Sequence, residues 1–313
     1  MKGRILIVTL AGGVGAARFL EGLIRAVPQK RVTIIGNVGD DSEFYGLHVS
    51  PDLDIVAYTL AGLVDREKGW GFKGDTFHCQ KMLQRYGYEP WFNLGDSDLA
   101  THLYRTSKLM RGEKLSSVTA SIVSDLGLHV SLLPSTDDLL QTHVISGNRR
   151  MHFQEYMVRF HTKPTVKRVF FKGAEAAKPA PKVIQSIKNA EGIIICPSNP
   201  IVSIGAILAV RGIRSALRKT RARIVAISPI VGGKTIKGPA DKMMKSLGVE
   251  PSALGVAEYY RDFIDALIID RVDKKLAAPI RALGVKAIVT QTLMKTMADK
   301  VHLAQAAVSE LKS

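Results

Sequence analysis

The N-terminal segment constrains the fold more than any other part of the chain. An apolar run at residues 4–10 leads through a glycine-rich turn into a helical pattern at residues 16–26, and residues 31–36 have the composition of a second strand. Strand, tight turn, helix and strand in this order form the βαβ unit that opens a doubly wound sheet. We therefore predict an α/β fold with a Rossmann-like, mostly parallel sheet.

The same alternation returns in the second half of the chain. Strand patterns occupy residues 192–196, 222–228, 266–270 and 286–290, and helical patterns occupy residues 181–190, 201–219, 275–283 and the segment from Met294. Between residues 65 and 165 the pattern changes to helix-like stretches at 75–86 and 96–110, followed by an alternating run at 152–160. We predict a core made of residues 1–64 and 166–313, and an inserted, largely helical lobe at residues 65–165.

Charge narrows the classes of partner. The net charge of +16 in 313 residues favours a polyanionic partner, which could be nucleic acid, an anionic membrane or a phosphorylated small molecule. Basic residues are spread along the chain without an aromatic-basic module, and the densest cluster, at 211–223, is interpreted as a solvated helix end running into a strand. Neither a nucleic acid nor a membrane is therefore expected as a partner.

Cysteine content and hydropathy predict a cytoplasmic protein. No apolar stretch approaches the length of a membrane span, which needs about 18 residues. The two cysteines, Cys79 and Cys196, have neither zinc spacing nor the density of a disulfide framework. A reducing compartment fits this composition best.

The turn after the first strand is a candidate phosphate site. It contains Gly12, Gly13, Val14 and Gly15, and Arg18 follows in the first helical turn. Glycines there let the backbone approach a phosphate, whose charge meets the free N–H groups and the positive end of the helix. The alternative is a turn that serves only chain geometry. No Gly-Lys-Ser/Thr follows, so it is not a P-loop.

An NAD site is disfavoured by the second strand. That strand ends at Asn37, where a dinucleotide site would have an acidic residue, and the glycine spacing also departs from the dinucleotide fingerprint. A second phosphate-binding candidate is the turn with Ser198, Asn199 and Pro200, which follows the strand at 192–196. Its alternative role is a capped helix start.

Carboxylates follow the second strand closely. Asp40 and Asp41 come directly after it, and Asp52 and Asp54 follow in the segment Ser-Pro-Asp-Leu-Asp. Such oxygens are the ligands of Mg²⁺ in sites that transfer groups between phosphates. Asp52 and Asp54 could equally be helix N-terminal residues that interact with the helix dipole. From the residues alone, both possibilities stay open.

These segments together resemble the 2-phospho-L-lactate transferase family. The resemblance covers nearly the whole chain and depends on the order and spacing of many short motifs. The matching segments are the Gly12 to Gly15 turn with residues 18–20, and residues 37–41, 48–54, 75–77, 94–102, 151–154, 197–200, 228–232, 238–240 and 255–260.

The resemblance implies an enzyme of coenzyme F-420 biosynthesis. The donor would be guanosine diphosphate linked to a small organic acid, the acceptor would be the ribityl hydroxyl of the deazaflavin Fo, and GMP would leave. Mg²⁺ would be held by Asp40, Asp41 and Asp54, and the inserted lobe would cover Fo with aromatic residues such as Trp91, Phe92 and Phe77. The alternative is a non-catalytic sugar-nucleotide-binding regulator. A homodimer is expected from base rates.

The resemblance also assigns residues to each substrate. Asp54 matches the deazaflavin-binding aspartate and is the expected catalytic residue, with Asn93 and Asp96 as further Fo contacts. The donor phosphates would lie against Gly12, Gly13, Val14, Gly15, Arg18, Ser198, Asn199 and Pro200. Ser97 stands where the family usually has Arg, so Arg105 or Lys73 is expected to supply that positive charge. Whether the acid is phospholactate, phosphoenolpyruvate or phosphoglycerate is not encoded in a motif.

Overall fold

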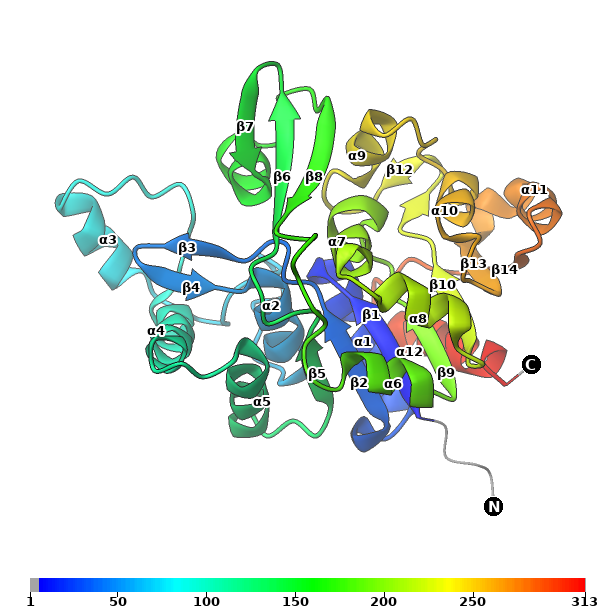
Figure 1. Cartoon of the computed structure of the whole chain (residues 1–313), viewed down its shortest axis with the longest axis horizontal. Coiled ribbons are helices and arrows are strands. Elements are labelled where there is room, and N and C mark those ends of the chain that lie inside the picture. The colour runs from blue at the N-terminus through cyan, green and yellow to red at the C-terminus, as the bar shows by residue number, and fades with distance from the viewer. Residues whose placement is uncertain (1–5, 313) are drawn as a thin grey trace.

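A seven-stranded parallel sheet organises the molecule (Figure 1). In the computed structural model, which describes residues 6–312, the strand order is β14-β13-β10-β9-β1-β2-β5 and each neighbouring pair is parallel. The strands are β1 (Ile7–Ala11), β2 (Val32–Gly36), β5 (Ser131–Pro134), β9 (Gly192–Ile195), β10 (Arg223–Ile227), β13 (Ala266–Asp270) and β14 (Lys286–Thr290). The predicted α/β fold is confirmed. Residues 4 and 5 of the predicted first strand lie outside the described residues.

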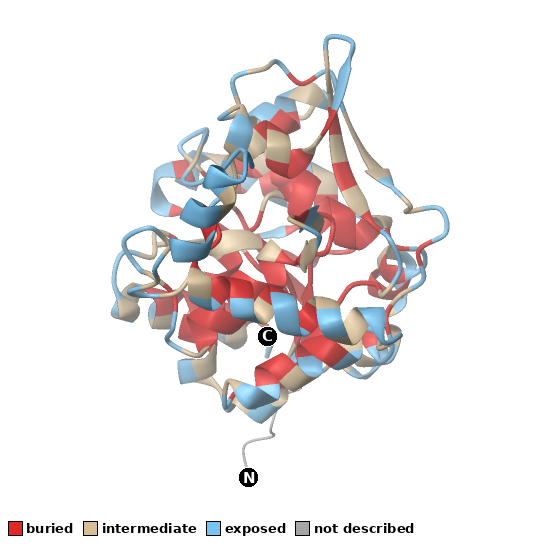
Figure 2. Cartoon of the chain, turned by 90° about the vertical axis from the view of Figure 1, so that its left-hand side faces the viewer, coloured by how far each residue is buried: buried red, intermediate tan, exposed pale blue. Residues whose placement is uncertain are grey.

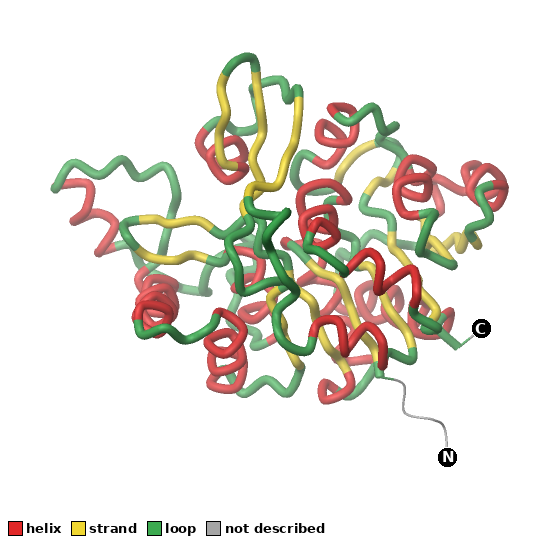
Figure 3. Tube along the Cα trace, in the orientation of Figure 1, coloured by secondary structure: helices red, strands yellow, loops and turns green. Residues whose placement is uncertain are grey.

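Helices cover both faces of the sheet (Figure 3). The helix α1 (Gly13–Ala26) packs against both α2 (Pro51–Leu60) and α12 (Met297–Glu310), while α6 (Val183–Asn189) packs against α8 (Ile213–Lys219) on the opposite face. Every residue of β1, β9 and β13 is buried. Strands covered on both sides are continuous apolar runs, which is why these segments showed no alternation in the sequence.

The strand order reverses between β1 and β9. From β1 the chain crosses to β2 on one side, whereas from β9 it crosses to β10 on the other. Right-handed crossovers in opposite directions place their helices on opposite faces. The loops at the carboxyl ends of the two strands then diverge, and a crevice opens between them.

The helix predicted at residues 201–219 is broken into three parts. They are the helical turn η3 (Pro200–Ile204), α7 (Gly205–Ala209) and α8, and the axis bends by 88° before α8. Gly212 begins α8 with a φ of 92°, a left-handed conformation that favours glycine. No single helix among residues 6–312 has the length and hydropathy of a membrane span. The segments Pro200–Ala209 and Ile213–Lys219 have that length and hydropathy only when they are counted together.

The predicted lobe differs from the observed one at its boundaries. Residues 37–130, the first excursion, contain β3 (Ser42–Phe44), β4 (Leu47–Val49), α2, α3 (His78–Arg85), α4 (Asp96–Met110) and α5 (Leu115–Asp125). The chain then forms β5, which pairs with β2 inside the main sheet. A strand of the core therefore interrupts the expected lobe at residues 65–165.

A second excursion, residues 135–191, follows β5. Its strands β6 (Gln141–Ser146), β7 (Arg149–His152) and β8 (Arg168–Lys172) form the antiparallel sheet at the top of Figure 1. The alternating run predicted at 152–160 is instead the end of β7 followed by the helical turn η2 (Glu155–Arg159). The remaining elements are η1 (Gln29–Arg31), β11 (Ile230–Val231), β12 (Lys234–Thr235), α9 (Ala240–Ser246), α10 (Ala253–Tyr260), η4 (Arg271–Leu276) and α11 (Ala277–Ala282).

The first excursion has a small hydrophobic core of its own. Phe44, Val49, Leu94 and Leu99 are buried together, apart from the large core around the main sheet. Figure 2 shows how buried residues concentrate in the interior of the molecule and exposed residues at its periphery. Phe44 stacks on Phe92, with ring centroids 4.0 Å apart. This cluster joins the hairpin β3-β4 to the segment before α4, so it fixes the position of the residues that border the crevice.

Candidate functional site

A cavity of about 760 Å³ lies at the crevice. Loops that follow the carboxyl ends of β1, β2, β9, β10 and β14 all contribute to its lining. One side, here called the glycine wall, consists of Gly12, Gly13, Val14, Gly15, Arg18, Pro197, Ser198 and Asn199. The other side, here called the aromatic wall, consists of Asp54, Ile55, Tyr58, Trp70, Phe92, Asn93, Leu94, Asp98 and His102.

The glycine wall is built by close backbone contacts. Gly13 has a φ of 75°, which glycine adopts without strain. A Cβ atom on Gly15 would lie 2.4 Å from the carbonyl oxygen of Pro197, so only glycine fits there. The Gly12 N–H donates to Oγ of Ser198 over 3.2 Å. The two turns predicted to bind phosphate therefore touch, beside the N-terminus of α1.

Asn199 caps the helical segment that follows it. Its Oδ1 accepts hydrogen bonds from the N–H groups of Ile201, at 3.0 Å, and Val202, at 3.3 Å. Ser198 and Asn199 line the cavity, but Pro200 begins the helical segment and is not part of the lining. Asn199 thus has the helix-capping role that was the alternative for this turn. Ser198 instead contacts the glycine turn.

Two carboxylates, Asp40 and Asp52, lie between the walls. Both accept from Nδ2 of Asn37, over 3.3 Å and 2.8 Å respectively, and both are at least nine-tenths buried. Burial and the nearby charge of Asp41 raise the pKa of Asp52 from 3.8 to about 7. Burial and the charge of Asp52 raise the pKa of Asp40 well above its usual value. A buried pair of this kind is stabilised by a proton or a cation.

Asp41 and Asp54 direct their carboxylates to other partners. Oδ2 of Asp41 accepts from Oγ of Ser50 over 2.7 Å and lies 3.0 Å from Nε2 of His48. Asp41 does not line the cavity. Asp54 lines it but is bound by the guanidinium of Arg105. Among residues 6–312 no three His, Cys, Asp or Glu side chains are grouped so as to hold a metal ion. The metal set expected from the sequence is not brought together.

The aromatic wall combines flat side chains with a buried polar network. Tyr58, Trp70 and Phe92 border the cavity, together with Phe153 from the second excursion. Of the expected aromatic residues, Phe92 is in place. Trp91 and Phe77 lie outside the lining, because Trp91 packs edge-on against Phe44 at 5.2 Å. Trp70, Tyr58 and Phe153 were not predicted from the sequence.

Arg105 and His102 connect this network to Asp54. Each has only 1% of its surface exposed. Burial acts to lower the pKa of Arg105, but the Asp54 carboxylate outweighs it and raises that pKa above its usual value. Nδ1 of His102 lies 3.2 Å from Nη1 of Arg105. No local pattern predicts this pairing, because Asp54 and Arg105 are 51 residues apart.

Asp96, Asn93 and Ser97, which the sequence also singled out, differ in whether they line the cavity. Asp96 accepts from the N–H groups of His78 and Cys79, each over 3.0 Å, so it caps α3 rather than facing the cavity. Asn93 does line the cavity and accepts from Gln80 over 3.1 Å. Ser97 is exposed at the start of α4.

The cations at the cavity are not those expected to compensate for Ser97. Arg105 is buried against Asp54, and neither it nor Lys73 belongs to the lining. The lining contains Arg18, Lys237 and Lys295 instead. The Arg18 guanidinium donates to the carbonyl oxygen of Met294, which directs it toward the loop at 292–295. Positive charge for a phosphate is therefore available at the cavity from residues other than Arg105 and Lys73.

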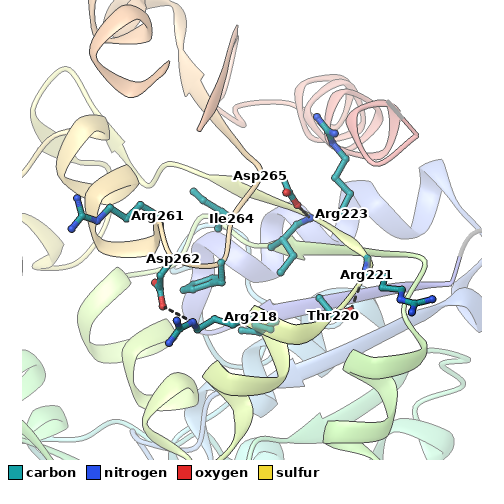
Figure 4. A pocket seen from close by; sticks show the side chains of 12 residues that line it. Arg218, Thr220, Arg221, Arg223, Arg261, Asp262, Ile264 and Asp265 are labelled. Atoms are coloured by element: carbon teal, nitrogen blue, oxygen red, sulfur yellow. Dashed lines mark hydrogen bonds and ion pairs between the residues drawn. The ribbon is translucent and has the colours of Figure 1, made fainter. Parts of the chain in front are cut away.

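A second cavity, of about 440 Å³, lies away from this site (Figure 4). It is lined by Arg218, Arg221, Arg223 and Arg261, with Asp262 and Asp265 between them. Asp262 pairs with Arg214 and Arg218, and Glu310 pairs with Arg223. Arg221 and Arg261 point outward in Figure 4. The interpretation of residues 211–223 as a solvated surface agrees with this arrangement.

Known proteins resemble the chain along its length. The family model described as 2-phospho-L-lactate transferase CofD matches residues 7–306. A phosphoenolpyruvate transferase of Kitasatospora aureofaciens is 44% identical over 97% of both chains. A 2-phospho-L-lactate transferase of Methanocaldococcus jannaschii is 38% identical over 96% of both chains.

Solved structures support the same fold. A UPF0052-family protein of Bacillus halodurans superposes with a TM-score of 0.67 at 16% identity, covering 98% of this chain and all of that one. At that identity the likeness concerns the fold alone. The sequence matches carry the assignment further, because they extend over both walls of the cavity. This chain is a transferase and belongs to the 2-phospho-L-lactate transferase family.

Proposed function

We propose that the chain transfers a phosphorylated three-carbon acid from a guanosine diphosphate donor to the ribityl hydroxyl of Fo and releases GMP. The observation that carries this proposal is the meeting of the two walls in one cavity, with the carboxylates of Asp40 and Asp52 between them. The named relatives favour a transferase over the alternative of a non-catalytic sugar-nucleotide-binding regulator.

The glycine wall suits the donor phosphates. Gly13 leaves open space beside the backbone, whereas Gly12 and Gly15 let Asp52 and the Pro197 carbonyl pack against the turn, and the N-terminus of α1 favours negative charge. Arg18, Lys237 and Lys295 add positive charge around the same space. The donor would therefore be held by fixed dipoles and cations before reaction.

The aromatic wall suits a flat acceptor. Trp70, Phe92 and Tyr58 offer faces for a deazaflavin ring, and Asp54 and Asn93 offer polar contacts beside them. In the proposed reaction the ribityl hydroxyl oxygen forms a bond to the phosphorus that carries the acid. The bond from this phosphorus to the bridging oxygen breaks, GMP leaves with the electron pair, and the hydroxyl proton is released. Positioning supplies most of the catalysis in such a step.

Asp40 and Asp52 fit a Mg²⁺ ion better than the set expected from the sequence. Their shared Asn37 contact and raised pKa values describe two carboxylates held together at a cost that a cation would remove. Mg²⁺ is commonly bound by one or two carboxylates together with substrate phosphates, and here it would neutralise charge on the phosphate of the leaving GMP. Asp54 would not be a ligand, because Arg105 binds both of its oxygens. Oδ2 of Asp41 is taken by Ser50 and His48, and its Oδ1 is buried without a hydrogen-bond partner, but Asp41 is not part of the cavity lining.

We propose phosphoenolpyruvate as the transferred acid. The relatives named phosphoenolpyruvate transferase are 44% identical to this chain, whereas those named 2-phospho-L-lactate transferase are 38% and 36% identical. The acids differ only in an unsaturation, so the preference depends on small differences in the lining rather than on another motif.

A product assay tests both parts of this proposal. The protein is incubated with Fo, Mg²⁺ and GMP joined through its phosphate either to phosphoenolpyruvate or to 2-phospholactate, and the products are separated and weighed by mass spectrometry. We expect faster formation of the phosphoenolpyruvyl product and its loss in Asp54→Ala. Exclusive use of the phospholactyl donor would overturn the assignment of the acid. Nucleotide binding without Fo binding would overturn the assignment of the acceptor.

A further inference from the structure

The guanidinium of Arg105 links the aromatic wall to helix α4. Its Nη1 donates to Oδ2 of Asp54 over 3.1 Å, and its Nη2 donates to Oδ1 of the same carboxylate. Asp54 lies in the first turn of α2 and lines the cavity. A two-point contact with a planar guanidinium fixes the orientation of a carboxylate as well as its charge.

The same guanidinium lies against the ring of His102, and this contact determines which ring nitrogen can accept a hydrogen bond. Nη1 of Arg105 lies 3.2 Å from Nδ1 of His102, and a guanidinium can only donate hydrogen bonds. A hydrogen bond between Arg105 and His102 therefore requires Nδ1 as the acceptor, which places the proton of a neutral ring on Nε2. Donation from Nδ1 to Asp54 is the competing arrangement, but Oδ2 of Asp54 is 3.7 Å away, which is too long for a hydrogen bond.

The protonated nitrogen of His102 faces the polar part of the aromatic wall. Nε2 is buried and makes no hydrogen bond of ordinary geometry within residues 6–312, although Oδ1 of Asp98 lies 3.3 Å away. The hydroxyl of Tyr58 donates to that same oxygen over 3.0 Å. Asp54, Tyr58, Asp98 and His102 all line the cavity. One cation thus orders a carboxylate and an imidazole that both belong to residues lining the cavity.

We propose that Arg105 is a positioning residue for the acceptor, which holds Asp54 in orientation and fixes His102 as the Nε2–H tautomer. This inference rests on the proposed function, because it takes the aromatic wall to be the acceptor side. Arg105 comes from α4 and Asp54 from α2, so acceptor binding depends on the docking of these two helices. The glycine wall makes no contact with Arg105 among the hydrogen bonds and ion pairs of the described residues.

Histidine NMR tests the tautomer without any substrate. Protein labelled with ¹⁵N-histidine gives long-range ¹H–¹⁵N correlations that identify the protonated nitrogen of each ring, and the signal lost in His102→Gln assigns His102. We expect the Nε2-protonated neutral form. A ring protonated on Nδ1, or on both nitrogens, overturns the proposed role of Arg105 toward His102.

Ligand binding tests the role toward Asp54. Arg105→Met leaves a buried carboxylate unpaired, so the comparison uses Arg105→Lys, which retains the charge but not the two-point contact. We expect the Kd for Fo to rise about tenfold, while the Kd for GDP with Mg²⁺ changes by less than about twofold. The matched control is Arg214→Lys, since Arg214 pairs with Asp262 away from the cavity, and it should change neither Kd.

Variants of His102 separate positioning from a general structural effect. His102→Asn retains an accepting oxygen near the place of Nδ1, whereas His102→Leu removes it. We expect Fo affinity to be largely retained in the first variant and lost in the second. Equal losses of Fo and GDP affinity in Arg105→Lys, or no loss of either, overturn the proposal. If the wild-type protein binds GDP but not Fo, the proposed function fails instead, and the NMR result still decides the Arg105–His102 contact.

Discussion

The two walls of the cavity are built by different means. The glycine wall consists largely of backbone, with a Gly15 position that touches the Pro197 carbonyl and a Gly12 N–H bound to Ser198. The aromatic wall depends on side chains, and its buried charges at Asp54 and Arg105 are paired across two helices. A backbone wall tolerates no added volume, whereas a side-chain wall tolerates no loss of a partner. The two should therefore respond to opposite kinds of substitution.

The largest expected effect is at the aromatic wall. Arg105→Met leaves the Asp54 carboxylate buried without a partner, and breaking a buried pair in this way costs about 3–5 kcal/mol. Urea unfolding followed by circular dichroism measures this loss. The double variant Arg105→Met with Asp54→Asn should recover part of it, because no unpaired charge remains. An equally large loss in the double variant would mean that packing of the Arg105 side chain, rather than its charge, supports this wall.

The carboxylate pair between the walls should make stability depend on pH. Burial comes first among the causes that raise the pKa of Asp52 from 3.8 to about 7. A carboxyl group whose pKa is higher in the folded state stabilises the protein at low pH, and this contribution is lost as the pH rises from about 4 through about 7. Without divalent cations we expect the free energy of unfolding to fall by roughly 2 kcal/mol or more across this window.

Denaturant titrations at a series of pH values measure that dependence. Asp52→Asn should flatten it, and Mg²⁺ should stabilise the wild-type protein more above the window than below it, because the pair is then ionised. A free energy of unfolding that rises with pH across this window would show that Asp40 and Asp52 are ionised in the folded protein without cost.

A smaller effect is expected at the glycine wall. Gly15→Ala places a Cβ atom 2.4 Å from the Pro197 carbonyl oxygen. Separating the two turns should cost about 1–3 kcal/mol, as overpacking does elsewhere. Thermal unfolding and GDP titration measure the two consequences, and nucleotide affinity should fall while Fo affinity is retained. A Gly15→Ala protein with unchanged stability and nucleotide affinity would refute the close contact between the turns.

The smallest effect is expected at Asp96, which lies next to the aromatic wall but outside it. Asp96→Ala removes the acceptor for the N–H groups of His78 and Cys79, so the start of α3 should exchange its amide hydrogens faster. Hydrogen exchange with mass spectrometry detects this local change. Asp96→Asn, which retains an acceptor, is the control. A marked loss of Fo affinity in both variants would return Asp96 to the acceptor contacts expected from the sequence.

The glycine wall could be predicted from the sequence because its signals are local. Gly12 to Gly15 and Ser198 to Asn199 each follow a strand directly, and the carboxyl ends of parallel strands meet at one edge of a sheet. The same reasoning placed Asp40 near the cavity. It left the role of Asp52 open, because a carboxylate in a first helical turn is favoured by the dipole whether or not it faces a site.

The aromatic wall could not be predicted to the same extent. Arg105 meets Asp54 only because α4 folds back on α2, and no short-range pattern encodes that docking. The family resemblance implied Trp91 as an acceptor contact, but Trp91 packs against the small core around Phe44, while Trp70 borders the cavity from a loop. Strand β5 was also missed, since a four-residue strand inside a helical segment carries little periodicity.

The first excursion has a consequence for how such proteins could diversify. Every residue named in the aromatic wall lies in one uninterrupted stretch between β2 and β5, whereas the glycine wall is assembled from the distant ends of β1 and β9. Replacement of residues 37–130 as one block would exchange the whole aromatic wall and leave the residues of the glycine wall unchanged. The residues of the aromatic wall thus lie in one block of the sequence, whereas those of the glycine wall come from two separate parts of it.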